Sequence, residues 1–131
     1  MKKIIVLLFI VLVGCSTWGE TQHGTPTLTF NHWEYSLELR GLDKIVVVKN
    51  GGQPVFIDKL YLSIDGKTYV ADPVYDRLDA RYKTAFWIDY KIREALQDAS
   101  FVSWRPGNYE DVKYDLVGKD FLMLKEFYAQ F

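Results

Sequence analysis

The sequence has little of several features that would point to a particular class of function. It contains one cysteine, Cys15, in 131 residues, so it cannot form an internal disulfide or a zinc site built from several thiolates. Its 16 Lys and Arg nearly balance its 17 Asp and Glu, which leaves no basic field for nucleic acid. Hydrophobic residues make up 49%, an ordinary globular composition. A disordered chain, a collagen-like fibre and a multi-span membrane protein are therefore not expected.

The first apolar run is short. It extends from Ile4 to Val13 without a charge, directly after Lys2 and Lys3. About 20 apolar residues are needed to cross a bilayer as a helix. A positive segment followed by roughly 7–15 apolar residues is instead the pattern of a secretory signal. The alternative is a buried N-terminal strand followed by an incidental cysteine.

The run ends in Leu-Val-Gly-Cys at residues 12–15, which resembles the lipobox of bacterial lipoproteins. The resemblance implies that a signal peptide, residues 1–14, is cleaved and that Cys15 is diacylated on sulfur. Its new amino group is often acylated in that family as well. Two acyl chains are enough for stable membrane attachment. Ser16 rather than Asp follows the cysteine, and in Gram-negative lipoproteins this implies outer-membrane anchoring with the protein facing the periplasm.

Residues 15–27 show neither apolar period and contain two Gly and one Pro. They are predicted to form the lipidated cysteine and a flexible tether. Residues 28–131 are predicted to form a single globular domain, since a chain of this length can bury roughly two thirds of its unfolded surface.

The domain has mainly strand patterns. Apolar and polar side chains alternate through residues 33–40, which favours a half-buried strand. Ile45 to Val48 is a β-branched run typical of a strand buried on both faces. Asp65-Gly66, between two β-rich runs, predicts a hairpin because a type I′ turn needs positive φ at both central residues. The stretch 45–69 resembles the strand-loop-strand of many Ig-like envelope domains.

Two segments have helical spacing instead. Apolar residues recur from Ile88 to Ala99 at intervals of three and four, and helix formers crowd residues 93–99. Phe121, Leu124 and Tyr128 also fall at helical spacing. We therefore expect a β-rich α+β fold: an antiparallel sandwich or small barrel with one helix near 90–99 and a short C-terminal helix.

Few residues point to catalysis. Gly-x-Ser-x-Gly, His-Glu-x-x-His and a phosphate-binding Gly loop are all missing from the sequence. His32, the one His of the predicted domain, is interpreted as an ordinary strand-end residue. Asp72, Asp76 and Asp79 could offer oxygens to a cation, but Arg residues between them favour a solvated ion network. We expect no metal, no cofactor and no enzymatic activity, with a small metal-dependent hydrolase as an alternative.

Aromatic residues are the one excess, at 16%. Tyr and Trp are frequent in recognition surfaces, and they also fill cores. Trp33, Tyr35 and Trp87 are interpreted as core residues. The residues assigned to partner binding are Tyr75, Tyr82, Trp104, Arg105 and Tyr109.

Together these features predict a non-catalytic, lipid-anchored binding or structural module of the bacterial cell envelope. Its partners would be the membrane, through Cys15, and another envelope protein or an envelope polymer, with no role for nucleic acid. An immunity, exclusion or hydrolase-inhibitor lipoprotein is the alternative within the same compartment.

Overall fold

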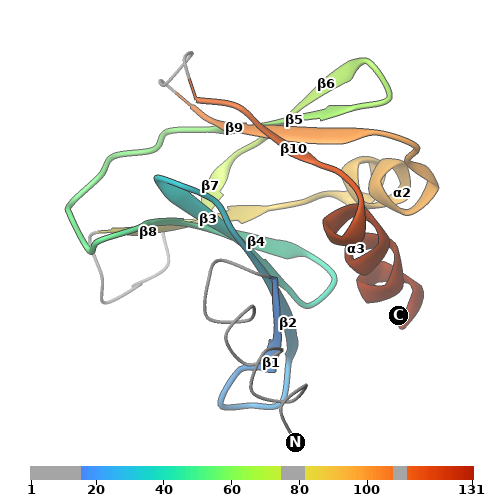
Figure 1. Ribbon diagram of the computed structural model, residues 1–131, viewed down its shortest axis with the longest axis horizontal. Helices are drawn as coiled ribbons and strands as arrows, with labels where there is room; N and C mark the ends of the chain where they lie inside the picture. The colour runs from blue at the N-terminus through green and yellow to red at the C-terminus, as the bar shows by residue number, and fades with distance from the viewer. Residues whose placement is uncertain (1–15, 75–81, 108–111) are drawn as a thin grey trace, which may run out of the picture.

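Two antiparallel sheets make up most of the protein. The structure is a computed structural model, and it describes residues 16–74, 82–107 and 112–131 (Figure 1). The larger sheet contains, in spatial order, β1 (Thr17–Glu20), β2 (Pro26–Asn31), β3 (Tyr35–Arg40), β4 (Lys44–Lys49), β8 (Lys83–Trp87) and β7 (Pro73–Val74). The smaller sheet contains β10 (Tyr114–Leu116), β9 (Val102–Pro106), β5 (Leu60–Ile64) and β6 (Lys67–Ala71).

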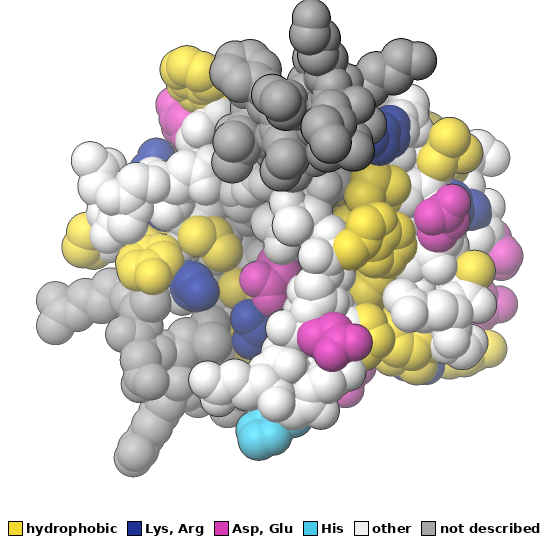
Figure 2. Space-filling view, turned by 60° about the horizontal axis from the view of Figure 1, so that its bottom comes forward, with side chains coloured by type: hydrophobic (Ala, Val, Ile, Leu, Met, Phe, Trp, Pro, Cys, Tyr) yellow, Lys and Arg dark blue, Asp and Glu magenta, His cyan; other side chains and the backbone are white. Residues whose placement is uncertain are grey.

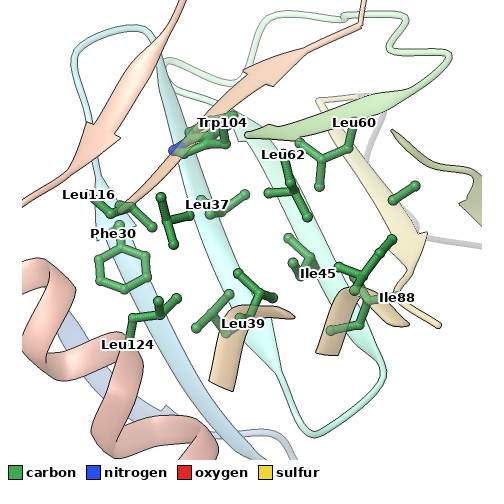
Figure 3. Packing of buried hydrophobic residues seen from close by; sticks show 14 of the residues in the cluster. Phe30, Leu37, Leu39, Ile45, Leu60, Leu62, Ile88, Trp104, Leu116 and Leu124 are labelled. Carbon is green, nitrogen blue, oxygen red and sulfur yellow. The ribbon is translucent and has the colours of Figure 1, made fainter. Parts of the chain in front are cut away.

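The two sheets face each other and enclose the core (Figures 1 and 3). Leu37 and Ile45 of the larger sheet and Leu62 of the smaller one are at most 1% exposed. This confirms the β-rich α+β prediction in its sandwich form. The barrel alternative is wrong, because among the described residues each sheet ends in edge strands that do not pair with each other.

Two helices lie at one end of the sheets (Figure 1). α2 (Tyr90–Asp98) confirms the helix predicted near 90–99, and its first turn is capped by Asp89, whose Oδ1 accepts a hydrogen bond of 2.9 Å from the Ile92 backbone N–H. α3 (Lys119–Ala129) confirms the C-terminal helix. The Lys125 ammonium donates to the carbonyls of Gln97 and Ala99, so α3 satisfies carbonyl groups at the end of α2. None of the helices in the described part of the chain has the length and apolar character needed to cross a bilayer.

The predicted hairpin at Asp65-Gly66 is also confirmed. The two residues have φ of 51° and 83°, and they join β5 to β6. Asp65 does more than turn the chain. Its Oδ1 accepts hydrogen bonds of 2.9 Å from the Ser100 N–H and 2.8 Å from the Phe101 N–H. The hairpin is thereby tied to the segment between α2 and β9.

The flexible tether predicted before the domain is not what the structure has. Thr17 to Glu20 form β1, which pairs antiparallel with β2 from Thr17 opposite Thr29 to Glu20 opposite Pro26. All four side chains of β1 are exposed, so the sequence of this strand shows no alternation of apolar and polar residues. Backbone pairing with β2 holds the strand in place. The division into a leader, an anchor and a globular domain stays a prediction.

Two of the three aromatic residues interpreted as core are exposed. Tyr35 is 3% exposed, as predicted, whereas Trp33 is 90% and Trp87 is 47% exposed. β3 begins only at Tyr35, so Trp33 lies in the turn before the strand rather than on its inner face. Phe86 takes the buried position at the end of β8, and Trp87 therefore faces outward, with the Lys44 ammonium 4.9 Å from its ring.

Candidate functional site

Five of the residues singled out from the sequence lie outside the described residues: Cys15, Tyr75, Asp76, Asp79 and Tyr109. Asp72 is exposed between β6 and β7, and its backbone carbonyl accepts a hydrogen bond of 3.1 Å from the Trp87 N–H. Across residues 16–74, 82–107 and 112–131, no three His, Cys, Asp or Glu side chains are grouped as metal ligands would be. Because Asp76 and Asp79 lie outside the described residues, a metal site formed by Asp72, Asp76 and Asp79 stays a prediction.

Trp104 is wrongly assigned to partner binding. It is 1% exposed, and its ring centre lies 5.6 Å from that of His32 and 4.9 Å from that of Tyr114. Successive side chains of a strand point to opposite faces, so Trp104 points into the core while its neighbour Arg105 points outward. Tyr82 is half-buried beside β4, where its backbone carbonyl accepts from the Lys49 N–H; its role in binding stays a prediction.

The outward side chains of the smaller sheet form two rows across its strands. In one row Ser63 of β5 is paired with Thr68 of β6 and with Ser103 of β9. In the next row Tyr61 of β5 is paired with Arg105 of β9. Paired residues on one face of a sheet have Cβ atoms about 5 Å apart, so three hydroxyls lie beside an aromatic ring and a guanidinium.

These rows border a hollow of about 80 Å³ on the outer face of the sheet. Its lining residues are Tyr61, Ser63, Thr68, Ser103, Trp104, Arg105 and Lys113. Trp104 borders the hollow although almost none of its surface is exposed. Sites for whole small molecules are about 300–1,000 Å³, so this hollow has room for a single chemical group of a larger ligand.

Arg105 supplies a positive charge that has no ion-pair partner among the described residues. Its guanidinium lies 4.4 Å from the centre of the Tyr61 ring, and no Asp or Glu of the described ranges forms an ion pair with it. Arg remains charged at all physiological pH values and can donate two parallel hydrogen bonds to a carboxylate or phosphate. Lys113 adds a second positive charge to the lining.

One acidic residue of the described ranges shares this face. Asp115 of β10 is paired with Ser103 and is exposed. It therefore lies diagonally across from Arg105, at a separation of about 8 Å for such positions. Asp115 does not line the hollow, but its charge reduces the positive potential around Arg105.

Sequence reasoning identified Arg105 but missed its surroundings. Arg105 lies within β9 and lines the hollow on the outer face of the sheet. The three hydroxyl residues carried no motif, because they come from three strands and meet only through the register of the sheet. The sequence did contain one signal of this polar face: the outward positions of β5 and β9 are all occupied by side chains with polar groups.

No protein family, no curated protein and no solved structure matches this chain. The function is accordingly argued from the residues of this site and from the N-terminal sequence.

Proposed function

We propose that this protein is a lipid-anchored, non-catalytic binding module of the bacterial envelope, and that the outer face of its smaller sheet binds an anionic group of an envelope polymer. The anchor rests on the lipobox-like residues 12–15 behind a short positive and apolar segment. The binding role rests on one observation. A half-buried Arg105 without a carboxylate partner among the described residues is fixed beside Tyr61 in a hollow lined with hydroxyls.

The lining favours binding over catalysis. Among the described residues the lining has three hydroxyl groups, of which that of Ser103 belongs to a residue only 1% exposed, and two cations, but neither a His nor a carboxylate. A hydroxyl nucleophile needs a neighbouring base to lose its proton. His32, the one His of the predicted domain, stacks on Tyr114 with its ring centre 4.5 Å away and lies beside the core residue Trp104.

The dimensions favour a polymer as the ligand. The hollow of about 80 Å³ admits one group of carboxylate or phosphate size. An extended polymer with repeated anionic groups can place one group against Arg105 and lie across the neighbouring hydroxyls. An envelope protein with an exposed acidic side chain is the alternative partner.

The test is co-sedimentation of the mature, detergent-solubilised protein with isolated peptidoglycan sacculi, which carry carboxylates, and with bead-bound lipopolysaccharide, which carries phosphates. Arg105→Gln should weaken binding to the preferred polymer by about tenfold or more, because charge-assisted hydrogen bonds contribute about 1.5–3 kcal/mol. Arg105→Lys should give an intermediate loss, since an ammonium cannot bind both oxygens of the anion in the same way.

Arg93 provides a matched control. Its guanidinium also lies over an aromatic ring, 5.6 Å from the centre of Tyr90, but on α2. Arg93→Gln changes the net charge equally and should bind as the wild type does. Equal losses in the two Gln variants would show unspecific charge attraction and contradict the site. If the wild-type protein binds neither polymer, the polymer proposal is wrong.

A further inference from the structure

We propose that the anionic group bound at the Arg105 site is a phosphomonoester, a tetrahedral group with two negative charges, rather than a carboxylate. The inference rests on the proposed function and narrows the chemistry of its ligand. It depends on a second cation, Lys113, which lines the same hollow as Arg105. The two cations match the two charges of the phosphate group.

The register of the strands brings the two cations together. Tyr114 of β10 is paired with Trp104 of β9, so the same antiparallel register places Lys113, the preceding residue, opposite Arg105. Side chains in such positions have Cβ atoms about 5 Å apart, and like charges there are destabilising. The fold therefore holds two positive charges next to each other in an arrangement that is electrostatically unfavourable until an anion binds.

Neither cation has an ion-pair partner in the described part of the chain. No described Asp or Glu pairs with Arg105 or Lys113, and Asp115 lies only diagonally across from Arg105. The larger sheet differs, because a guanidinium nitrogen of Arg40 lies 2.7 Å from a carboxylate oxygen of Glu38. Figure 2 shows acidic and basic side chains interspersed on the lower side of the molecule. A carboxylate can neutralise one of the two unpaired cations, whereas a phosphomonoester can neutralise both.

The hydroxyl groups of the lining supply further hydrogen-bond donors. Ser63 and Thr68 are paired across β5 and β6, and neither hydroxyl forms a hydrogen bond with another described residue. A guanidinium alone can bind both oxygens of a carboxylate through two parallel hydrogen bonds. A phosphomonoester has three strong acceptor oxygens, so its third oxygen can accept from the Lys113 ammonium or from a hydroxyl. The donors of the site therefore exceed what a carboxylate needs and suit a phosphate group.

Release of the protein from bead-bound lipopolysaccharide by soluble sugars tests this chemistry. Glucose 6-phosphate, glucose 6-sulfate and glucuronate present a tetrahedral dianion, a tetrahedral monoanion and a planar monoanion on similar sugars. At pH 7.5, glucose 6-phosphate should release the mature, detergent-solubilised protein at a concentration lower by about fivefold or more than either other sugar. One additional pair of opposite charges about 4 Å apart contributes about this factor even in water.

A second pH value separates charge from shape. A phosphomonoester binds its second proton near about pH 6, so the advantage of glucose 6-phosphate over glucose 6-sulfate should shrink at pH 5.5. The sulfate keeps its single charge at both pH values. Any change in the protein itself affects both sugars, so their ratio reports the charge of the ligand.

Lys113→Gln should remove most of the preference for glucose 6-phosphate, while Arg105 still binds the monoanions. The Lys113 side chain is exposed, so the variant should fold as the wild type does. Lys67→Gln is the matched control. Lys67 is also exposed and belongs to β6 of the same sheet, but it precedes Thr68 and therefore points to the other face. This variant should keep the preference.

The outcomes separate the inference from the proposed function. Equal release by the three sugars, or a preference for phosphate that survives Lys113→Gln, overturns the phosphomonoester and leaves the proposed function standing. Binding to peptidoglycan sacculi but not to lipopolysaccharide does the same. A wild-type protein that binds neither polymer contradicts the proposed function itself.

Discussion

The guanidinium of Arg105 lies 4.4 Å from the centre of the Tyr61 ring, and the backbones of the same two residues are paired across β9 and β5. The register of the sheet therefore places the two side chains next to each other, and the contact with the ring positions the guanidinium. A group held in this way keeps its geometry when no ligand is bound, which lowers the entropic cost of binding.

Asp115→Asn should strengthen binding of an anion to the Arg105 site. Asp115 faces the same side of the sheet as Arg105 and is exposed. A negative charge about 8 Å away in water weakens anion binding by only about twofold, so the expected gain is of that size and should shrink as salt is added. Titration at two salt concentrations measures it. Glu126→Gln, an exposed acid of α3, should change nothing; equal gains in both variants would indicate a general charge effect.

Trp104→Phe and Trp104→Ala should differ strongly in stability. Trp104 is 1% exposed in the core, so truncation to Ala should lower the free energy of unfolding by about 3–5 kcal/mol. Within the described ranges no group accepts a hydrogen bond from its indole Nε1, so Phe removes no such bond and should cost clearly less. Urea unfolding followed by circular dichroism compares the variants. A Trp104→Ala protein as stable as the wild type would contradict the buried position.

Stability should fall on acidification because of His32. Burial lowers the pKa of the His32 imidazole below its usual value, and the charge of Asp120 acts in the opposite direction. The unfolded state therefore binds a proton below about pH 6.5 while the folded state remains neutral. The free energy of unfolding should decrease as pH falls from about 6.5 through the lowered pKa of the folded state. Chemical unfolding at pH 7.5 and 5.5 measures this difference.

Two variants identify the titrating group. His32→Phe keeps a ring against Tyr114, on which His32 stacks at 4.5 Å, and should remove part of the loss of stability between pH 7.5 and 5.5. His23→Gln changes an exposed residue between β1 and β2 and should leave the loss as in the wild type. An unchanged loss in His32→Phe would assign the pH dependence to other groups.

Asp65→Ala should destabilise the junction of the hairpin with the segment before β9. The change removes the acceptor of the Ser100 and Phe101 N–H groups and places Ala at a positive φ of 51°. We expect a loss of about 1–3 kcal/mol in the free energy of unfolding. Asp65→Asn retains an oxygen acceptor and a side chain that tolerates positive φ, so its loss should be the smaller one. Hydrogen exchange at the Ser100 and Phe101 amides locates the effect.

The parts of the fold that were predictable depend on local chemistry. The Asp65-Gly66 turn needs two positive φ angles, and α2 combines an Asp cap with apolar residues at helical spacing. Both signals lie within about ten residues of sequence. β1 gave no such signal because its four side chains are all exposed.

The candidate site was only half predictable for a related reason. Arg105 was identified as a binding residue, but Tyr61 is 44 positions away and meets it only through strand pairing. Trp104 was assigned to partner binding, whereas its side chain lies on the inner face of β9 and is 1% exposed. Side-chain direction in a strand follows from which neighbours pair, and a single sequence does not specify that pairing.

Anchoring through Cys15 is tested most directly by the intact mass of the protein extracted from bacterial membranes, compared with a Cys15→Ala variant. We expect the wild-type mass to lack residues 1–14 and to include the acyl chains of a lipidated cysteine. The variant should retain its leader or be released from the membrane fraction. A wild-type protein of uncut mass without acyl chains, or a variant that stays in the membrane with the same processing, would contradict the anchor.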